Sequence, residues 1–261
     1  MLRSTLLILL YLAVSVLPAG ADPVLDLMPL KKAFAPLDSS LPFQSHTTLS
    51  ATGSRNGLSF TLREDLQIIA RRPSRYHVKL IQYNAAGTTA KQLAVVWNGI
   101  NVWTYQPSTH RYSITSLQGF EDADSDIPTL GLIVGGFYLG DGRPMIQGFH
   151  NLTADNSADV LAALSKMDIT LSRQAQSVKG HDDYVYSMTL VKQNLAYQFY
   201  VDTQTNKLTR IDLTIAQDGL QITFREDIAR IGSLSILPKS AFVFLPPLRT
   251  SQAASVSATR F

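Results

Sequence analysis

The sequence contains no cysteine among its 261 residues. It therefore forms no disulfide and offers no thiolate to act as a nucleophile or as a metal ligand. It also lacks the lipid-modified cysteine that follows the cleavage site of a bacterial lipoprotein. Because no covalent cross-link is available, hydrophobic burial has to supply the stability of the folded chain.

Long apolar runs are also missing, apart from one at the N-terminus. Arg3 precedes the apolar residues Leu6 to Leu17, and a small-residue pattern ends at Ala21. A membrane anchor is the alternative, but the run is shorter than the roughly 20 residues that a spanning helix needs. We therefore expect residues 1–21 to be a secretory signal peptide, cleaved after Ala21, and the mature protein to be soluble in the periplasm.

Charge of one sign is not concentrated anywhere. The chain has 23 Lys and Arg residues against 20 Asp and Glu residues, and the basic ones are scattered. Nucleic-acid binding requires a basic stripe that follows the phosphates. We therefore expect no nucleic-acid partner.

Recognisable catalytic and metal-binding patterns are absent from the sequence. The acidic run that starts at Asp122 has Ile127 and Ile133 where a calcium loop needs Gly and Glu. None of the five histidines has the spacing of a zinc motif, and there is no G-x-S-x-G nucleophile pattern. We expect no catalytic residues, cofactor or metal, so the protein is predicted not to be an enzyme; a hydrolase with an unrecognised site is the weakest alternative.

An alternating pattern from Leu58 to Ala70 is the first positive signal. Its even positions are apolar and their odd neighbours are polar, which predicts one long antiparallel strand with a single buried face. Glu64 is the one residue that breaks the apolar face.

Asn98-Gly99 predicts a tight hairpin that places Trp97 opposite Ile100. Val95 and Trp97 then share one face, while Trp103 and Tyr105 share the other. Both faces are apolar, so the hairpin is either covered twice or lines a cavity.

Four more alternating segments lie between Tyr184 and Phe224, about ten residues apart, and they predict an up-and-down meander. We expect a single, mainly β domain over residues 22–249, followed by a flexible tail over 250–261. The glycine-rich region Gln118–Met167 includes a helical stretch from Ser157. It is either a lid over the sheet or a long surface excursion.

Arg72 ends an apolar strand just before Pro73. One interpretation is an exposed ion pair worth about 0–1 kcal/mol. The other is a donor at the mouth of an apolar cavity, where the guanidinium binds backbone carbonyls of a lid.

The motif Arg71-Arg72-Pro73-Ser74-Arg75-Tyr76, the hairpin after Trp97 and the segment Trp103-Thr104-Tyr105-Gln106-Pro107 resemble the LolA-like periplasmic lipoprotein carriers. The ending Phe242-Val243-Phe244-Leu245-Pro246-Pro247 is similar to the closing strand of that family. The resemblance implies an incomplete antiparallel β-barrel, or half-barrel, closed by a helical lid. It also implies that the lid-gating arginine is Arg72 and the following aromatic residue Tyr76.

On this basis we expect a monomeric carrier that binds the acyl chains of lipoproteins or another lipid for transport towards the outer membrane. Its partners would be the cargo, an inner-membrane donor and an outer-membrane acceptor. An envelope sensing or scaffold module that binds a protein is the alternative. The predicted ligand and lid residues are Arg72, Tyr76, Phe60, Leu62, Ile68, Val95, Trp97 and Trp103.

Overall fold

The computed structural model describes residues 25–38, 41–55, 58–72, 75–123, 130–139, 142–178, 180–217, 219–238 and 240–256. The predicted signal peptide, residues 1–21, lies outside these ranges. Among the described residues, no helix has the length and hydrophobicity that a membrane crossing needs.

The protein is mainly β, as the sequence predicts. Its twelve strands are hydrogen-bonded in the order β12-β6-β5-β4-β3-β2-β1-β11-β10-β9-β8-β7. Their bounds are β1 Phe43–Arg55, β2 Leu58–Arg71, β3 Arg75–Tyr83, β4 Thr89–Trp97, β5 Asn101–Gln106, β6 Arg111–Ser116, β7 Ile169–Val178, β8 His181–Leu190, β9 Leu195–Asp202, β10 Leu208–Gln217, β11 Leu220–Ser233 and β12 Ser251–Gln252.

The sheet is not closed into a barrel, because β12 and β7 stand at its two ends in the hydrogen-bonding order. All but one of the pairings between strands that the structure defines are antiparallel, the exception being the parallel contact of β12 with β6. The finer expectation of a half-barrel under a helical lid stays a prediction.

The helices of the described residues are few and short. They are α1 Met28–Asp38, η1 Pro107–Thr109, α2 Leu117–Ala123, the π-helix η2 Gly131–Tyr138, α4 Arg143–His150, α5 Ser157–Lys166 and η3 Val191–Gln193. Asp26 caps α1 by accepting a hydrogen bond from the amide of Met28 at 3.0 Å. Pro29 lies in the first turn of α1. Its missing N–H costs nothing there, because the first N–H groups of a helix have no partner within the helix, so Pro29 does not break the helix.

The chain forms two compact units. Unit 1 contains the described residues up to Asp38 together with Ala51–Phe60 and Asp141–Asp227. Unit 2 contains Ser39–Ser50, Thr61–Gly140 and Ile228–Phe261. Strands β1, β2 and β11 each contribute residues to both units. The prediction of a single domain over residues 22–249 stays a prediction.

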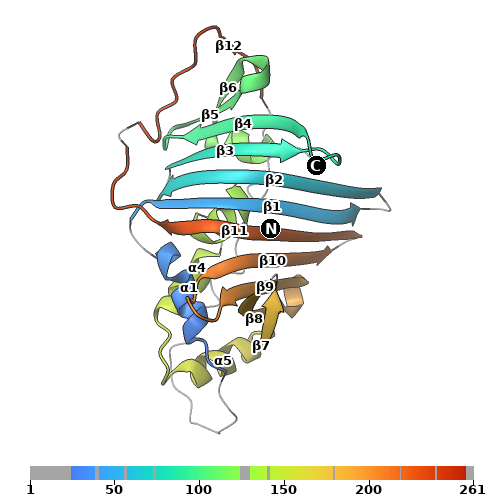
Figure 1. The fold of residues 1–261 in the computed structure, drawn as a ribbon, viewed down its shortest axis with the longest axis vertical. Helices are drawn as coiled ribbons and strands as arrows, with labels where there is room; N and C mark the ends of the chain where they lie inside the picture. Colours follow the sequence, from blue (N-terminus) through green and yellow to red (C-terminus); the bar gives the residue numbers. More distant parts are fainter. Residues whose placement is uncertain are drawn as a thin grey trace. The chain divides into compact units, whose positions relative to one another are not determined.

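In unit 1, strands β7 to β10 pack against helices on one side (Figure 1). The ring of Phe34 in α1 contacts Phe199 of β9 edge-on at 5.3 Å and stacks on Phe149 of α4 at 5.4 Å. This aromatic cluster joins the two helices to the sheet and forms the core of the unit.

The hairpin between β4 and β5 differs from the expected two-residue turn. Trp97 pairs with Val102 rather than with Ile100, and the three residues Asn98, Gly99 and Ile100 connect the two strands. The side chain of Asn98 accepts hydrogen bonds from the amides of Ile100 and Asn101, and Gly99 adopts φ of 100°. Because the register slips by two residues, every side chain of β4 and β5 keeps its predicted face.

The C-terminal segment is ordered by backbone pairing. Ser251 and Gln252 form β12, and the amides of Ser251 and Ala253 donate to the carbonyls of His110 and Tyr112. These residues belong to the predicted flexible tail 250–261, and the flexibility of that tail stays a prediction.

Candidate functional site

One face of the sheet in unit 2 is mainly apolar. Ile68, Val78 and Val95 pair in sequence across β2, β3 and β4, and all three are buried. The next row contains Ala70, Tyr76 and Trp97. We call this surface the apolar face of unit 2; it also includes the inward residues Phe43, Leu49, Leu66, Leu80, Leu93 and Val102.

Four of the predicted ligand residues meet on this face. Ile68, Tyr76 and Val95 are buried, and Trp97 is half-buried with its ring 5.3 Å from that of Tyr76. Leu62 is half-buried farther along β2, beyond Glu64. The structure thus brings together most of the predicted lining in unit 2.

Two predicted residues lie elsewhere. Phe60 belongs to unit 1, where its ring lies so close to Gly53 that a Cβ there would come within 2.6 Å of it. Trp103 points to the opposite face of the sheet, because it pairs with Val96 rather than with an inward residue. Neither residue therefore belongs to the apolar face of unit 2.

Arg72 contacts the last residue of η2. Its Nε donates a hydrogen bond of 2.9 Å to the carbonyl oxygen of Tyr138, and its guanidinium carbon lies 4.5 Å from the centre of the Tyr138 ring. A guanidinium suits this position because it donates within its plane and presents a cationic face to an aromatic ring. A hydrogen bond from the guanidinium of Arg72 to a backbone carbonyl is the kind of contact described in the second interpretation of Arg72.

Tyr138 is itself anchored to the start of β1. Its ring stacks on Phe43 with centres 4.8 Å apart, and its hydroxyl donates to the carbonyl oxygen of Leu41 at 3.1 Å. The rest of η2 is strongly apolar and buried, including Leu132, Ile133 and Val134. Helix η2 is therefore packed as part of the core of unit 2.

Glu64 lies on the apolar face and has no exposed surface. Burial raises the pKa of its carboxyl to about 8, although the positive charge of Lys91 and a hydrogen bond from Gln82 act in the other direction. The carboxyl is therefore mostly protonated at neutral pH. Its Oε1 accepts the hydrogen bond from Gln82 Nε2 at 3.1 Å.

Glu64 has a counterpart elsewhere in the sequence. The tripeptide Arg63-Glu64-Asp65 recurs as Arg225-Glu226-Asp227 in β11. Glu226 also has no exposed surface. Two glutamates within the same tripeptide thus occupy fully buried strand positions.

The opposite face of β3 to β6 is covered by the C-terminal segment. Phe244 contacts the rings of Trp103, Tyr105 and Tyr112, with centres between 5.7 and 6.4 Å apart. His77 Nδ1 lies 3.1 Å from the carbonyl oxygen of Ala241, and burial is the main cause that lowers the pKa of this imidazole. The hairpin is thus covered on both faces, which was one of its two sequence interpretations.

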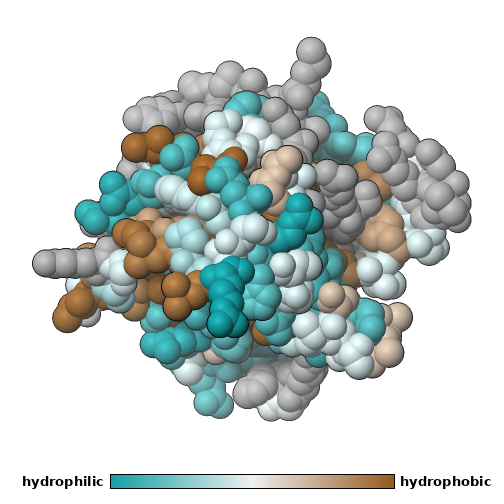
Figure 2. Space-filling view, turned by 90° about the horizontal axis from the view of Figure 1, so that it is seen from above, coloured by the Kyte–Doolittle hydropathy of each residue, from teal (hydrophilic) through white to brown (hydrophobic). Residues whose placement is uncertain are grey.

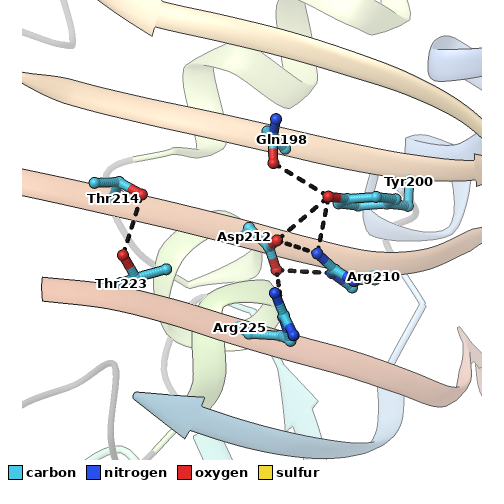
Figure 3. Close-up of polar contacts among 7 residues, drawn as sticks. All are labelled: Gln198, Tyr200, Arg210, Asp212, Thr214, Thr223 and Arg225. Atoms are coloured by element: carbon cyan, nitrogen blue, oxygen red, sulfur yellow. Dashed lines mark hydrogen bonds and ion pairs between the residues drawn. The ribbon is translucent and has the colours of Figure 1, made fainter. Parts of the chain in front are cut away.

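The outward side of the sheet in unit 1 is polar (Figure 3). Asp212 accepts hydrogen bonds from Arg210 Nε at 2.8 Å and from Arg225 Nε at 3.2 Å, while Arg210 also donates to the hydroxyl of Tyr200. That hydroxyl donates in turn to Gln198. The two guanidinium groups are satisfied within this network, which makes it a stabilising layer rather than an anion site.

One polar pocket of about 670 Å³ lies in unit 1. It is lined by Ser54, Asn194, Ala216, Gln217, Gly219, Leu220 and Gln221. None of the predicted ligand residues lines it, and its polar wall does not suit an acyl chain. Within the described ranges, no three His, Asp or Glu side chains form a group that could hold a metal ion.

The comparisons with known proteins give structural likenesses only. No family model matches the chain, and no curated protein matches it. It is similar to a LolA superfamily protein from Nitrosomonas europaea, at 14% identity and a TM-score of 0.34, over 83% of this chain and 96% of that one.

A putative outer membrane lipoprotein-sorting protein domain from Vibrio parahaemolyticus is similar at 9% identity and a TM-score of 0.34, over 83% of this chain and 95% of that one. The complex of Pseudomonas aeruginosa MucA and MucB gives 14% identity and a TM-score of 0.36, over 82% of this chain and 58% of that one. Because these TM-scores lie below 0.5, the family resemblance rests on the sequence motifs.

Proposed function

We propose that this protein is a periplasmic carrier that binds the acyl chain of a lipoprotein or another lipid on the apolar face of unit 2, without catalysing a reaction. The contact of Arg72 with Tyr138 is the observation that carries the proposal. It ties the apolar helix η2 to the end of β2, beside the face on which Tyr76 and Trp97 meet. In this proposal η2 is the lid and Arg72 is its latch.

The free energy that holds η2 closed is comparable to the free energy gained by burying a few methylenes of an acyl chain. A hydrogen bond from a charged donor contributes about 1.5–3 kcal/mol, and the stacking of a cation on an aromatic ring adds about 0.5–1 kcal/mol. Each buried methylene of an acyl chain contributes about 0.8 kcal/mol. Roughly three to five methylenes therefore offset the opened latch, so that a lipid chain can displace η2 while the empty protein stays closed.

The two tryptophans offer a direct test, because Trp97 lies on the apolar face and Trp103 on the opposite one. The variant Trp103→Phe keeps only Trp97, and Trp97→Phe keeps only Trp103. Brominated stearate quenches a nearby indole on contact. We expect it to quench Trp97 strongly and Trp103 weakly, with unbrominated stearate as the control.

Two outcomes would sink the proposal: no binding of stearate, or quenching of Trp103 as strong as that of Trp97. Native mass spectrometry of the protein purified from a periplasm without detergent gives an independent check. We expect the mass of the protein with an acylated ligand.

A scaffold or sensing module is the second candidate, and the exposed C-terminal segment favours it. Leu245 and Leu248 are 78% and 93% exposed in a segment that also contains Pro246 and Pro247. Figure 2 shows hydrophobic side chains in small separate groups among hydrophilic ones, and such groups can contact a protein. Retention of one protein partner together with failure to bind any acyl chain would support this candidate over the carrier.

A further inference from the structure

Buried polar side chains interrupt the apolar face of unit 2, and three of them lie on the adjacent strands β1 and β2. Ser45 is 5% exposed, Thr47 is 1% exposed and Glu64 is fully buried. Within the described part of the chain, Ser45 Oγ, Thr47 Oγ1 and Glu64 Oε2 have no hydrogen-bond partner. A buried polar atom without a partner costs about 1–3 kcal/mol, so three on one face are a large cost for a structural feature alone.

Thr47 lies between Ser45 and Glu64 in the sheet. Ser45 and Thr47 are two residues apart on β1, so they project on the same side, about 7 Å from each other. Thr48 Oγ1 donates to Asp65 Oδ1 at 2.8 Å on the other side of the sheet, which aligns the adjacent strands β1 and β2. That alignment places Glu64 one diagonal step from Thr47.

Apolar residues enclose this polar cluster along both strands. Phe43 and Leu49 flank Ser45 and Thr47 on β1, and Leu66 and Ile68 follow Glu64 on β2. The cluster therefore lies between apolar residues along both strands and is itself buried. A head group that stays in water would not reach it, whereas a polar group part-way along an acyl chain would.

The chemistry of the cluster favours an uncharged ligand group. Ser45 and Thr47 each offer a hydroxyl that can donate or accept, and the protonated carboxyl of Glu64 adds a donor. No cation is hydrogen-bonded to the free oxygen of Glu64 in the described residues. A hydroxyl can donate and accept in turn, so it satisfies such a cluster without bringing a charge into the interior.

We propose that Ser45, Thr47 and Glu64 form a polar subsite that binds a hydroxyl group carried part-way along an acyl chain. The subsite rests on the proposed carrier function and specifies its ligand class: hydroxylated acyl chains are bound in preference to plain ones. A site built to hydrogen-bond a hydroxyl discriminates strongly against a ligand that lacks it, because its own polar groups then stay unpaired.

The test is a competition assay on the mature protein with a fluorescent fatty-acid reporter. The probes are stearate and three octadecanoic acids that carry one hydroxyl at carbon 2, 10 or 12. We expect at least one hydroxylated acid to bind about tenfold more tightly than stearate. Thr47→Val, which has the same shape without the hydroxyl, is expected to reduce this ratio to between 1 and about 3, because it removes one of the groups that pair with the hydroxyl of the ligand.

Thr48→Val is the matched control, since Thr48 lies on the other side of the sheet and bonds to Asp65. It is expected to keep the tenfold preference. Thermal unfolding checks that both variants fold, and Thr47→Val is expected to be at least as stable as the natural protein because it removes an unpaired buried hydroxyl.

The proposal is overturned if no hydroxylated acid is preferred, as when a bound water satisfies the cluster, or if the preference survives Thr47→Val. Both outcomes leave the carrier function standing, since stearate still binds. If no octadecanoic acid binds, the carrier function itself fails, and the subsite with it.

Discussion

Arg72 holds Tyr138 in two ways, through a 2.9 Å hydrogen bond from its Nε to the backbone carbonyl and through its guanidinium plane 4.5 Å from the centre of the ring. The first contact fixes the end of η2 and the second fixes the side chain that stacks on Phe43. One side chain thereby controls both the backbone and the packing of the proposed lid.

Replacing Arg72 by Leu is expected to impair the hand-over of acylated cargo while leaving the fold intact. Without the latch the open state is favoured, so a bound chain is retained and its release slows by up to about tenfold. Stopped-flow transfer of a fluorescent acyl chain to acceptor vesicles measures the rate, and far-ultraviolet circular dichroism checks the fold. Arg71→Leu, at an exposed neighbouring position, is the control; unchanged transfer kinetics in Arg72→Leu would count against the latch.

The raised pKa of Glu64 predicts that the stability of the protein falls as pH rises through neutrality. Its pKa is raised from 4.5 to about 8 on folding, so between these values the folded chain binds a proton that the unfolded chain has released. The free energy of unfolding therefore falls as pH rises from 4.5 to about 8, by on the order of a few kcal/mol for this group, and then levels off.

Glu64→Gln removes this contribution and keeps a polar side chain of the same shape. Urea unfolding across pH 4 to 9 should show that the variant gains stability relative to the natural protein as pH rises. Parallel pH profiles for the two proteins would show that the carboxyl is not buried in its neutral form.

Phe244 fastens the C-terminal segment to the sheet through the rings of Trp103, Tyr105 and Tyr112. Phe244→Ala is expected to lower the free energy of unfolding by about 2 kcal/mol, less than for a fully buried Phe because this ring is half-buried. In a Trp97→Phe background, the emission of Trp103 should shift to longer wavelength as water reaches its ring. Leu245→Ala, at a position that is 78% exposed, should change neither quantity.

Asp212 neutralises Arg210 and Arg225 in unit 1. Asp212→Asn keeps the shape but removes the charge, and it leaves the half-buried guanidinium of Arg210 without this ion pair. We expect a loss of about 3 kcal/mol in urea unfolding. Asp155→Asn, on an exposed surface position, should be close to neutral, and an equal effect of the two changes would contradict the role of the network.

Much of the sheet could be predicted because its strands alternate clearly. The pattern from Leu58 to Ala70 predicts β2, and the later alternating segments predict β8 to β11. Strand β1 escaped prediction, since Ser45 and Thr47 occupy inward positions where the pattern requires apolar residues. Ser45 and Thr47, which interrupt the apolar pattern of β1, also belong to the candidate polar subsite.

The candidate site was predicted in part. Arg72 and Tyr76 were identified through a motif, and Val95 and Trp97 through the hairpin pattern. The contact partner of Arg72 could not be predicted, because Tyr138 lies 66 residues away in the chain. Trp103 was grouped with the lining although alternation places it on the other face, where Phe244 covers it.

The sequence by itself determined the mainly β class, the faces of the β4–β5 hairpin and the absence of disulfides, since these depend on residue type and on a period of two along the strand. Only the tertiary structure decided which face packs against η2, which carbonyl Arg72 binds and how far Glu64 is removed from water. These properties depend on contacts between residues far apart in the chain, and the local pattern of a strand carries no information about its distant partners.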